Sequence, residues 1–241
     1  LAKEMPEAYT NMGLTAENLA GIYEIERGAQ EEFAIESHRR AANAEFGDVI
    51  IPIITSDGVV STDGCIRPDS DSKSLSRLKP VFKSDGSVTA GTSSPLTDGA
   101  AFVLVCSEEF AQDQGLEILA SVESTAVSGC SPEIMGIGPV SATKKALLRA
   151  GLTLEEVDVI ELNEAFAAQS LAVIEELGLD ISKVNIDGGA LALGHPLGAS
   201  GARIVGRAAT ILAREDAKIA LATMCIGGGQ GIATILRKVN K

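Results

Sequence analysis

The stretch that decides how this chain folds is residues 185–203, which read Asn185-Ile186-Asp187-Gly188-Gly189-Ala190-Leu191-Ala192-Leu193-Gly194-His195-Pro196-Leu197-Gly198-Ala199-Ser200-Gly201-Ala202-Arg203. An apolar strand pattern at 184–186 runs into this glycine-rich stretch, and a helix pattern follows from Ser200 to Arg214, so it predicts a tight strand-to-helix loop. Glycine suits a backbone that takes positive φ or approaches another group closely. His195 stands inside this loop, where an imidazole can meet a substrate and change protonation near neutral pH. A histidine satisfied within an ordinary turn is the alternative interpretation.

Two other predicted strands also deliver polar residues into loops. Residues 219–224 predict a strand that leads into Cys225 and the glycines 227–229, whose amides can form an oxyanion pocket beside the thiol. An inert buried cysteine is the alternative. Residues 157–162 predict a strand that ends at Asn163, at the start of a helix. Polar groups at the carboxyl ends of several strands are where an α/β sheet places a site.

The order of elements from residue 118 onward predicts an α/β fold. Strands alternate with helices, one of them from Ser141 to Ala150 with Ser141 as its cap and Gly151 as its stop. Such alternation predicts a mostly parallel sheet covered by helices on both faces. The last two strands, about 218–224 and 231–237, meet through the glycine turn and predict an antiparallel hairpin at the edge of the sheet.

The first 46 residues have a helical pattern. Thr15 is placed to cap a helix that begins at Ala16. In a charged helix over residues 26–45, Glu36 and Arg40 have the i,i+4 spacing of an ion pair. His38 lies on this charged helix and is not expected to be catalytic.

The middle of the chain changes character after residue 46. Residues 49–55 predict a strand, and residues 57–98 are rich in Gly, Ser, Asp and Pro, which predicts irregular loops. Residues 99–106 predict a strongly apolar strand, followed by a short helix at 108–114.

Composition excludes several classes of function. The formal net charge of −13 argues against nucleic acid and against an anionic membrane surface. No apolar run approaches the ~20 residues of a membrane span, and the first residues do not form a signal peptide. The four cysteines are too far apart for a CxxC metal or redox motif, so we expect reduced thiols, no metal and a cytoplasmic location.

One segment runs against the overall charge. Residues 61–83 carry five basic residues against three acidic ones. A local positive excess in an acidic chain suits a small polyanionic ligand. A solvated loop of mixed charge is an equally good interpretation.

Three motifs resemble the C-terminal signatures of the thiolase family, in the same order and at similar spacing. They are Asn163-Glu164-Ala165-Phe166-Ala167-Ala168-Gln169, Gly194-His195-Pro196-Leu197-Gly198-Ala199-Ser200-Gly201 and Cys225-Ile226-Gly227-Gly228-Gly229-Gln230-Gly231. The resemblance implies two similar α/β halves with a loop domain inserted in the first. On that plan, residues 1–97 are a partial, CoA-binding loop domain, 98–117 close the N-terminal half, and 118–241 are the C-terminal domain.

The resemblance also implies a reaction and roles for four residues. Thiolases cleave a 3-ketoacyl-CoA with CoA to acetyl-CoA and a shortened acyl-CoA, or run the reverse Claisen condensation. His195 would activate a nucleophilic cysteine and donate to the thioester oxygen. Asn163 would hold a water in the same oxyanion hole. Cys225 would move the Cα proton, provided that its surroundings lower its pKa, and the amide of Gly227 would serve a second oxyanion hole.

Ligand contacts and subtype follow from the same resemblance. Arg67 and Ser94 match positions that touch CoA in the family. The positions that line the pantetheine and acyl groove match Met12, Phe82, Ala90, Met135 and Phe166. Asn11 stands where biosynthetic acetoacetyl-CoA thiolases often have histidine. The Thr92-Ser93-Ser94 stretch and the residues before Cys225 are closer to degradative 3-ketoacyl-CoA thiolases of β-oxidation.

The resemblance lacks one part of the family pattern. None of the four cysteines occupies the position of the thiolase nucleophile, which lies in the N-terminal half, so we expect these 241 residues to be inactive alone. The expected partners are acyl-CoA and CoA, the missing half, a second or further copies in a homodimer or homotetramer, and a β-oxidation subunit. No cofactor other than CoA as substrate is expected.

Four alternatives stay open. An acetoacetyl-CoA thiolase shares the motifs, and a non-catalytic acyl-CoA-binding fragment would explain the absent nucleophile. A ketoacyl synthase has the same fold, but those enzymes generally use two histidines, and the Asn163 and Cys225 motifs do not fit them. A dinucleotide site is the weakest alternative, since His195-Pro196 stands in the glycine loop where the fingerprint expects glycine.

Overall fold

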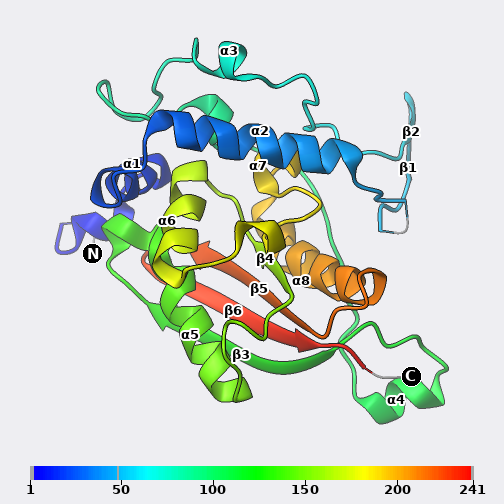
Figure 1. The fold of residues 1–241 in the computed structure, drawn as a ribbon. Coiled ribbons are helices and arrows are strands. Elements are labelled where there is room, and N and C mark those ends of the chain that lie inside the picture. Colours follow the sequence, from blue (N-terminus) through cyan, green and yellow to red (C-terminus); the bar gives the residue numbers. More distant parts are fainter. Residues whose placement is uncertain (1–2, 48, 240–241) are drawn as a thin grey trace.

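The computed structural model describes residues 3–47 and 49–239 as a four-stranded sheet between layers of helices (Figure 1). Its elements, in chain order, are η1 (Pro6–Tyr9), α1 (Met12–Ile22), α2 (Arg27–Asn43), β1 (Ile53–Thr55), β2 (Gly58–Val60), α3 (Ser72–Leu75), η2 (Ala90–Thr92), α4 (Glu108–Asp113), β3 (Ser121–Gly129), η3 (Pro132–Ile137), α5 (Gly138–Ala150), β4 (Val159–Leu162), α6 (Ala167–Leu177), η4 (Ile181–Lys183), α7 (Ala190–Leu193), α8 (Leu197–Arg214), β5 (Ile219–Ile226) and β6 (Gln230–Arg237).

The main sheet is mixed, with strand order β3-β6-β5-β4. β4 and β5 are parallel, whereas β6 is antiparallel to both β5 and β3. The prediction of a mostly parallel sheet is therefore wrong for these strands. The β5–β6 hairpin is confirmed, but it does not form the edge, because β3 adds to the outer side of β6 and leaves the hairpin in the centre.

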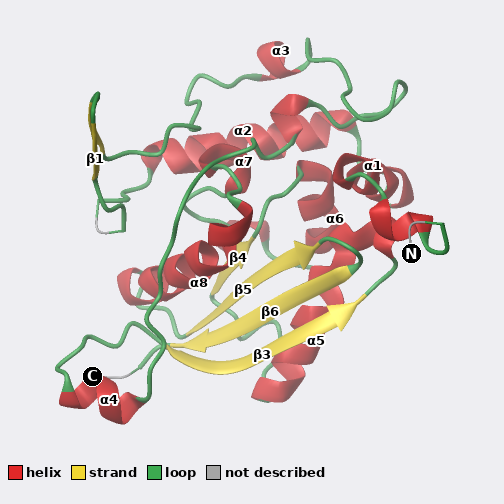
Figure 2. Cartoon of the chain, turned by 180° about the vertical axis from the view of Figure 1, so that it is seen from behind, coloured by secondary structure: helices red, strands yellow, loops and turns green. Residues whose placement is uncertain are grey.

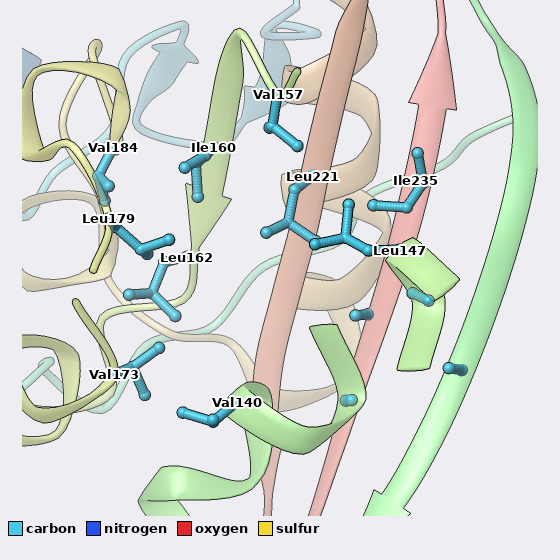
Figure 3. Close-up of a cluster of buried hydrophobic side chains, with 14 of the residues drawn as sticks. Val140, Leu147, Val157, Ile160, Leu162, Val173, Leu179, Val184, Leu221 and Ile235 are labelled. Atoms are coloured by element: carbon cyan, nitrogen blue, oxygen red, sulfur yellow. The ribbon is translucent and has the colours of Figure 1, made fainter. Parts of the chain in front are cut away.

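Apolar side chains cover both faces of this sheet, as the helix and strand alternation predicts. On one face, α5 and α6 pack on the strands, and Figure 3 shows this cluster, whose labelled members are Val140, Leu147, Val157, Ile160, Leu162, Val173, Leu179, Val184, Leu221 and Ile235. On the other face, α8 packs through Ile204, Ala208, Ile211 and Leu212 (Figure 2). Burial on both sides holds the ends of β4 and β5 in fixed positions.

The N-terminal helices lie over one end of this layered body. α2 crosses above α6 and α7, and α1 packs against α6 and η3 (Figure 1). The Glu36–Arg40 ion pair predicted on α2 is present, with Nε and Oε1 2.7 Å apart. Ser37 of α2 meets the loop that follows β4, because its hydroxyl donates to the Glu164 carboxylate at 2.6 Å, and it meets the start of α7 by accepting from the Gly189 amide at 3.0 Å.

Several helix starts differ from the sequence prediction. α1 begins at Met12, because the side chain of Asn11 accepts from the Gly13 amide at 2.9 Å and takes the capping role expected of Thr15. α5 and α8 each begin three residues before the predicted start. In α5 a proline in the first turn supplies a helical φ without needing a hydrogen-bond partner. The stop at Gly151 is as predicted, with φ 66°.

Two predicted strands do not form. Val184 makes only a single bridge to Ile160, and Asn185 then turns away with φ 46°. Residues 99–106 are extended but pair with no strand of the described chain, and Phe102, Leu104 and Val105 are 72–89% exposed. This segment runs beside α8 towards α4, with Val103 next to Gly206. The strand prediction fails here because extended backbone needs a neighbour for its hydrogen bonds.

Candidate active site

The site begins where the parallel strands β4 and β5 end side by side. The Asn163 amide, one residue past β4, donates to the Thr223 carbonyl on β5 at 3.0 Å. Cys225 lies two residues further along β5, on the same face as Thr223. The parallel pairing of β4 and β5 thus brings the side-chain amide of Asn163 and the thiol of Cys225 to the same end of the sheet.

His195 meets Asn163 at this end. Its Nε2 lies 3.4 Å from Asn163 Nδ2, and its Nδ1 lies 2.6 Å from Ser200 Oγ. The Ser200 hydroxyl donates to the Pro196 carbonyl at 3.1 Å, so it is left to accept a hydrogen bond from Nδ1. The proton of the neutral ring then sits on Nδ1, and Nε2, which faces the N–H of the Asn163 side chain, is the ring nitrogen that accepts a proton from a substrate or a nucleophile.

Two features keep this imidazole neutral. Burial lowers the pKa of His195 below its ordinary 6.5, and the positive charge of Arg203 lowers it further. Arg203 is itself largely buried and donates through Nη1 to the Gly194 carbonyl at 2.7 Å. The same guanidinium therefore fixes the backbone before the histidine and opposes its protonation. A neutral imidazole is the form required of a general base.

The surroundings of Cys225 are apolar, whereas the role expected from the sequence requires surroundings that lower the pKa of its thiol. Its side chain is buried in a small apolar cluster with Met135 and Ala165, against which Phe166 packs. Burial raises the pKa of the thiol to about 12. The condition that its surroundings lower this pKa is not met here, because burial dominates and no cation among the described residues acts on the sulfur to offset the loss of water. A neutral thiol can still donate a proton to carbon.

The glycine turn after β5 lies next to α1. Gly228 and Gly229 have φ of 82° and 91°, which a residue with a side chain rarely adopts. Gly227, the first residue of the turn, is exposed, and the thioether of Met12 lies beside it. Its amide is thus on the surface between α1 and the end of β5, where an incoming group can reach it.

Most of the predicted groove residues lie around this point. Phe82 and Phe166 meet edge to face, with ring centroids 5.8 Å apart. Both the amide and the hydroxyl of Ser94 donate to the Ala165 carbonyl at 3.0 Å. Arg67 and Ala90 are exposed and take part in none of these contacts. The structure thus gathers Met12, Phe82, Ser94, Met135 and Phe166 near Cys225 and Gly227.

The remaining histidine has a structural environment. Nδ1 of His38 accepts from the Arg67 backbone amide at 3.1 Å, which ties α2 to the loop that precedes α3. Burial lowers the pKa of His38. His38 thus joins two segments of the fold, and the expectation that it is not catalytic stays a prediction.

Sequence reasoning missed the residues that support this site. Ser200 and Arg203 were recognised only as parts of the glycine-rich stretch, yet both contact the His195 loop. Glu164 was recognised only as part of its motif, yet it is buried and bonded to three segments. The available signal was their position, because each stands within a few residues of a predicted site residue.

Three further observations concern ligands and membranes. Within residues 3–47 and 49–239, no group of three or more His, Cys, Asp or Glu side chains is placed to hold a metal ion. Cys65, Cys106, Cys130 and Cys225 are all free thiols. No helix in the described part of the chain combines the length and the apolar character needed to cross a bilayer.

Comparison with known proteins places this geometry in one family. The model of the thiolase C-terminal domain matches residues 116–238, and that of the thiolase N-terminal domain matches residues 3–109. The 3-ketoacyl-CoA thiolase of Marinomonas sp. (strain MWYL1) is 50% identical over 252 residues, covering 99% of this chain and 64% of that protein. The 3-ketoacyl-CoA thiolase of Vibrio vulnificus (strain YJ016) is 51% identical over 251 residues, covering 99% and 65%. This chain therefore spans about 64–65% of the length of these relatives.

Solved structures agree. The Bacillus anthracis acetyl-CoA acetyltransferase superimposes with a TM-score of 0.90 at 44% identity, covering 95% of this chain and 60% of that one. Human mitochondrial 3-ketoacyl-CoA thiolase in complex with CoA gives the same score and identity, covering 95% and 59%. The thiolase-like α/β fold is thus established at both the sequence and the structural level, and this chain belongs to the thiolase family.

Proposed function

We propose that this chain forms part of an acyltransferase that cleaves 3-ketoacyl-CoA with CoA, giving acetyl-CoA and a shortened acyl-CoA. The observation that carries the proposal is the contact between Asn163 Nδ2 and His195 Nε2 at the end of β4, with Cys225 beside the same loop. The names of the relatives, several of them 3-ketoacyl-CoA thiolases, support this reaction.

In the first half-reaction, His195 acts as a general base. Its Nε2 accepts the proton of a nucleophilic cysteine, and the resulting thiolate attacks the ketone carbonyl of the substrate. The Ser200 hydroxyl holds Nδ1 and so keeps the accepting nitrogen directed at the site. None of the four cysteines here matches that nucleophile, so we propose that it lies outside these 241 residues.

The second requirement is to stabilise an enolate. When the carbon–carbon bond breaks, negative charge develops on the thioester oxygen of the leaving acetyl-CoA unit. Asn163 Oδ1 is buried and has no hydrogen-bond partner among the described residues, which suits the holding of a water beside that oxygen. The neutral thiol of Cys225 donates its proton to the enolate carbon, and the Gly227 amide donates to the carbonyl of the acyl-enzyme.

In the last step the acceptor is CoA. The Cys225 thiolate left by the first proton transfer takes the proton of the CoA thiol, the CoA sulfur attacks the acyl-enzyme carbonyl, and the nucleophilic cysteine leaves and regains its proton from His195. We propose that CoA lies over Met12, Phe82 and Phe166, with Ser94 and Met135 at the acyl end, and that Arg67 and Ala90 contact it where they are exposed. The exposed basic residues of the 61–83 segment suit its phosphates. CoA is substrate here, and the proposal includes no further cofactor or metal.

An assay of thiolysis tests the proposal. The complete enzyme that contains this chain is expected to convert acetoacetyl-CoA or a longer 3-ketoacyl-CoA, with CoA, into acetyl-CoA, and His195→Asn is expected to abolish the burst of acyl-enzyme. The 241-residue chain alone is expected to give no acetyl-CoA. Turnover by the chain alone would contradict the proposed origin of the nucleophile, and a normal burst in His195→Asn would contradict the role of the imidazole.

A biosynthetic acetoacetyl-CoA thiolase is the second candidate. The Bacillus anthracis acetyl-CoA acetyltransferase matches this chain as well as the human 3-ketoacyl-CoA thiolase does, which keeps this candidate open. Asn11, which caps α1 where biosynthetic enzymes often have histidine, favours the degradative type. Comparing kcat/KM for acetoacetyl-CoA with that for 3-ketodecanoyl-CoA separates the two.

We propose the degradative, cytoplasmic β-oxidation enzyme, acting as a homodimer or homotetramer with or without a β-oxidation partner subunit. Binding of CoA by the complete enzyme without turnover would instead favour a non-catalytic acyl-CoA-binding role.

A further inference from the structure

The carboxylate of Glu164 lies at the meeting point of three segments that are distant in sequence. It is 1% exposed. It accepts from Ser37 Oγ on α2 at 2.6 Å, from Asn185 Nδ2 at 2.8 Å and from the Leu191 amide at 3.1 Å. Burial raises the pKa of this carboxyl, and its three donors oppose that rise. A buried carboxylate that accepts three hydrogen bonds is a costly group unless every partner stays in place.

These partners connect the loops that carry the candidate site. Glu164 follows Asn163 and precedes Ala165, which contacts Cys225. Leu191 belongs to α7, whose last residue is two positions before His195. The single carboxylate of Glu164 thus spans the distance between the loop that supplies the amide and the segment that supplies the imidazole.

Two further contacts close the network. Ser37 Oγ, which donates to Glu164, also accepts from the Gly189 amide at 3.0 Å. A methyl group on Gly189 would lie 2.3 Å from the carboxyl carbon of Glu164, so only glycine allows this close approach. Asn185 also bonds Leu162, the last residue of β4: its Oδ1 accepts from the Leu162 amide, and its Nδ2 donates to the Leu162 carbonyl. The end of β4, α2 and α7 are therefore fixed to one another through Glu164.

We propose that Glu164 is a positioning residue, which holds Asn163 and His195 at their mutual distance by bonding α7 and Ser37 to the loop after β4. It contacts no substrate in this arrangement and acts through the two residues that do. This inference rests on the proposed function, because the value of the fixed distance lies in the enolate and base chemistry assigned to those side chains. Loosening the geometry by ~1 Å is enough to cost about 100-fold in rate.

The test compares Glu164→Gln with Glu17→Gln. Glutamine keeps the shape of the side chain, but its amide nitrogen must replace either Oε1, which accepts from Asn185, or Oε2, which accepts from Ser37 and Leu191, and a nitrogen cannot accept there. Glu17 is the matched control, because it too is a buried glutamate whose carboxylate accepts backbone amides, from Ser87 and Val88, both at 2.9 Å. Ser87 and Val88 belong to the segment between Phe82 and Ala90, in the proposed CoA groove, and they donate to neither the loop of Asn163 nor that of His195. This control is therefore judged on kcat and on the pKa of His195, and not on KM.

Three measurements are made on each variant in the complete enzyme: kcat, KM for the 3-ketoacyl-CoA, and the pKa of His195 by NMR. Glu164→Gln is expected to lower kcat by about 100-fold with KM little changed, and to raise the pKa of His195 towards 6.5 as its loop loosens. Glu17→Gln is expected to keep the parental kcat and His195 pKa. Ser37→Ala, which removes one of the three donors, is expected to give an intermediate loss and serves if Glu164→Gln fails to fold.

The outcomes separate this inference from the proposed function. A parental kcat and His195 pKa in Glu164→Gln, or equal losses in Glu17→Gln, would overturn the positioning role and leave thiolysis standing. If the parent enzyme shows no thiolysis, the proposed function fails, but the NMR measurement still tests whether Glu164 holds His195. An unchanged His195 pKa in that case would overturn the inference as well.

Discussion

At the scale of single residues, His195 illustrates how burial prepares a base. Its pKa lies below 6.5 in the folded protein because the ring is partly buried and faces Arg203. In the unfolded chain the pKa returns to its ordinary value, so below pH 6.5 the unfolded state binds a proton more readily than the folded one. Folding stability from this group is therefore present at neutral pH and is lost as the pH falls.

We therefore predict that the imidazole of His195 titrates below pH 6.5. The measurement is an NMR titration of the ring C–H signals, assigned with His195→Asn. The free energy of unfolding of the parent chain is expected to fall between pH 7 and 5 by more than that of His195→Asn. A His195 titration midpoint above 6.5 would contradict the burial of the ring and the effect of the Arg203 charge on it.

Cys225 shows the opposite effect of burial on an acid. Because burial raises the pKa of this thiol to about 12, hardly any thiolate exists at neutral pH. We predict that iodoacetamide at pH 7.5 alkylates the exposed Cys106 long before it alkylates Cys225. Peptide mass spectrometry over time measures both rates in one sample. Faster labelling of Cys225 than of Cys106 would mean that its surroundings stabilise the thiolate.

At the scale of elements, the contact between β6 and the start of α5 is the tightest packing near the sheet. A methyl group on Gly231 would lie 2.1 Å from the carbonyl carbon of Gly138, which is a backbone atom and cannot swing aside. Gly231→Ala is therefore predicted to reduce the free energy of unfolding by about 1–3 kcal/mol. Thermal or urea unfolding measures the change.

The matched control for this element is Gly21→Ala. Gly21 lies in α1, and no atom comes within 4 Å of the position that its Cβ would take. Alanine there is expected to raise the free energy of unfolding by about 0.5–1 kcal/mol, because it removes backbone freedom from the unfolded chain. Equal effects at both glycines would contradict the close approach of α5 and β6.

At the scale of the whole molecule, the segment 102–105 presents large apolar side chains to solvent. Phe102, Leu104 and Val105 are 89%, 72% and 75% exposed. A contiguous apolar surface of this kind favours association. We predict that the isolated chain self-associates in a concentration-dependent way, and that Phe102→Glu with Leu104→Glu reduces this association. Sedimentation velocity measures it, and identical profiles for parent and variant would refute the prediction.

The sequence determined much of this protein through local rules. The glycines at 151 and 178 end α5 and α6 because only glycine readily adopts their positive φ, and the hairpin after Cys225 follows from consecutive glycines between two apolar runs. The three motifs were sufficient to identify the family. Each of these signals is contained within a short stretch, so the residues that carry it are neighbours in the chain.

Only the tertiary structure decided the order and direction of the strands, the loss of the strand at 99–106, and the raised pKa of Cys225. It also decided the network around Glu164, whose partner Ser37 lies 127 positions away in the sequence. The physical reason is the same in each case. Burial and hydrogen bonding depend on which distant segments meet, and the residue types of one segment do not contain that information.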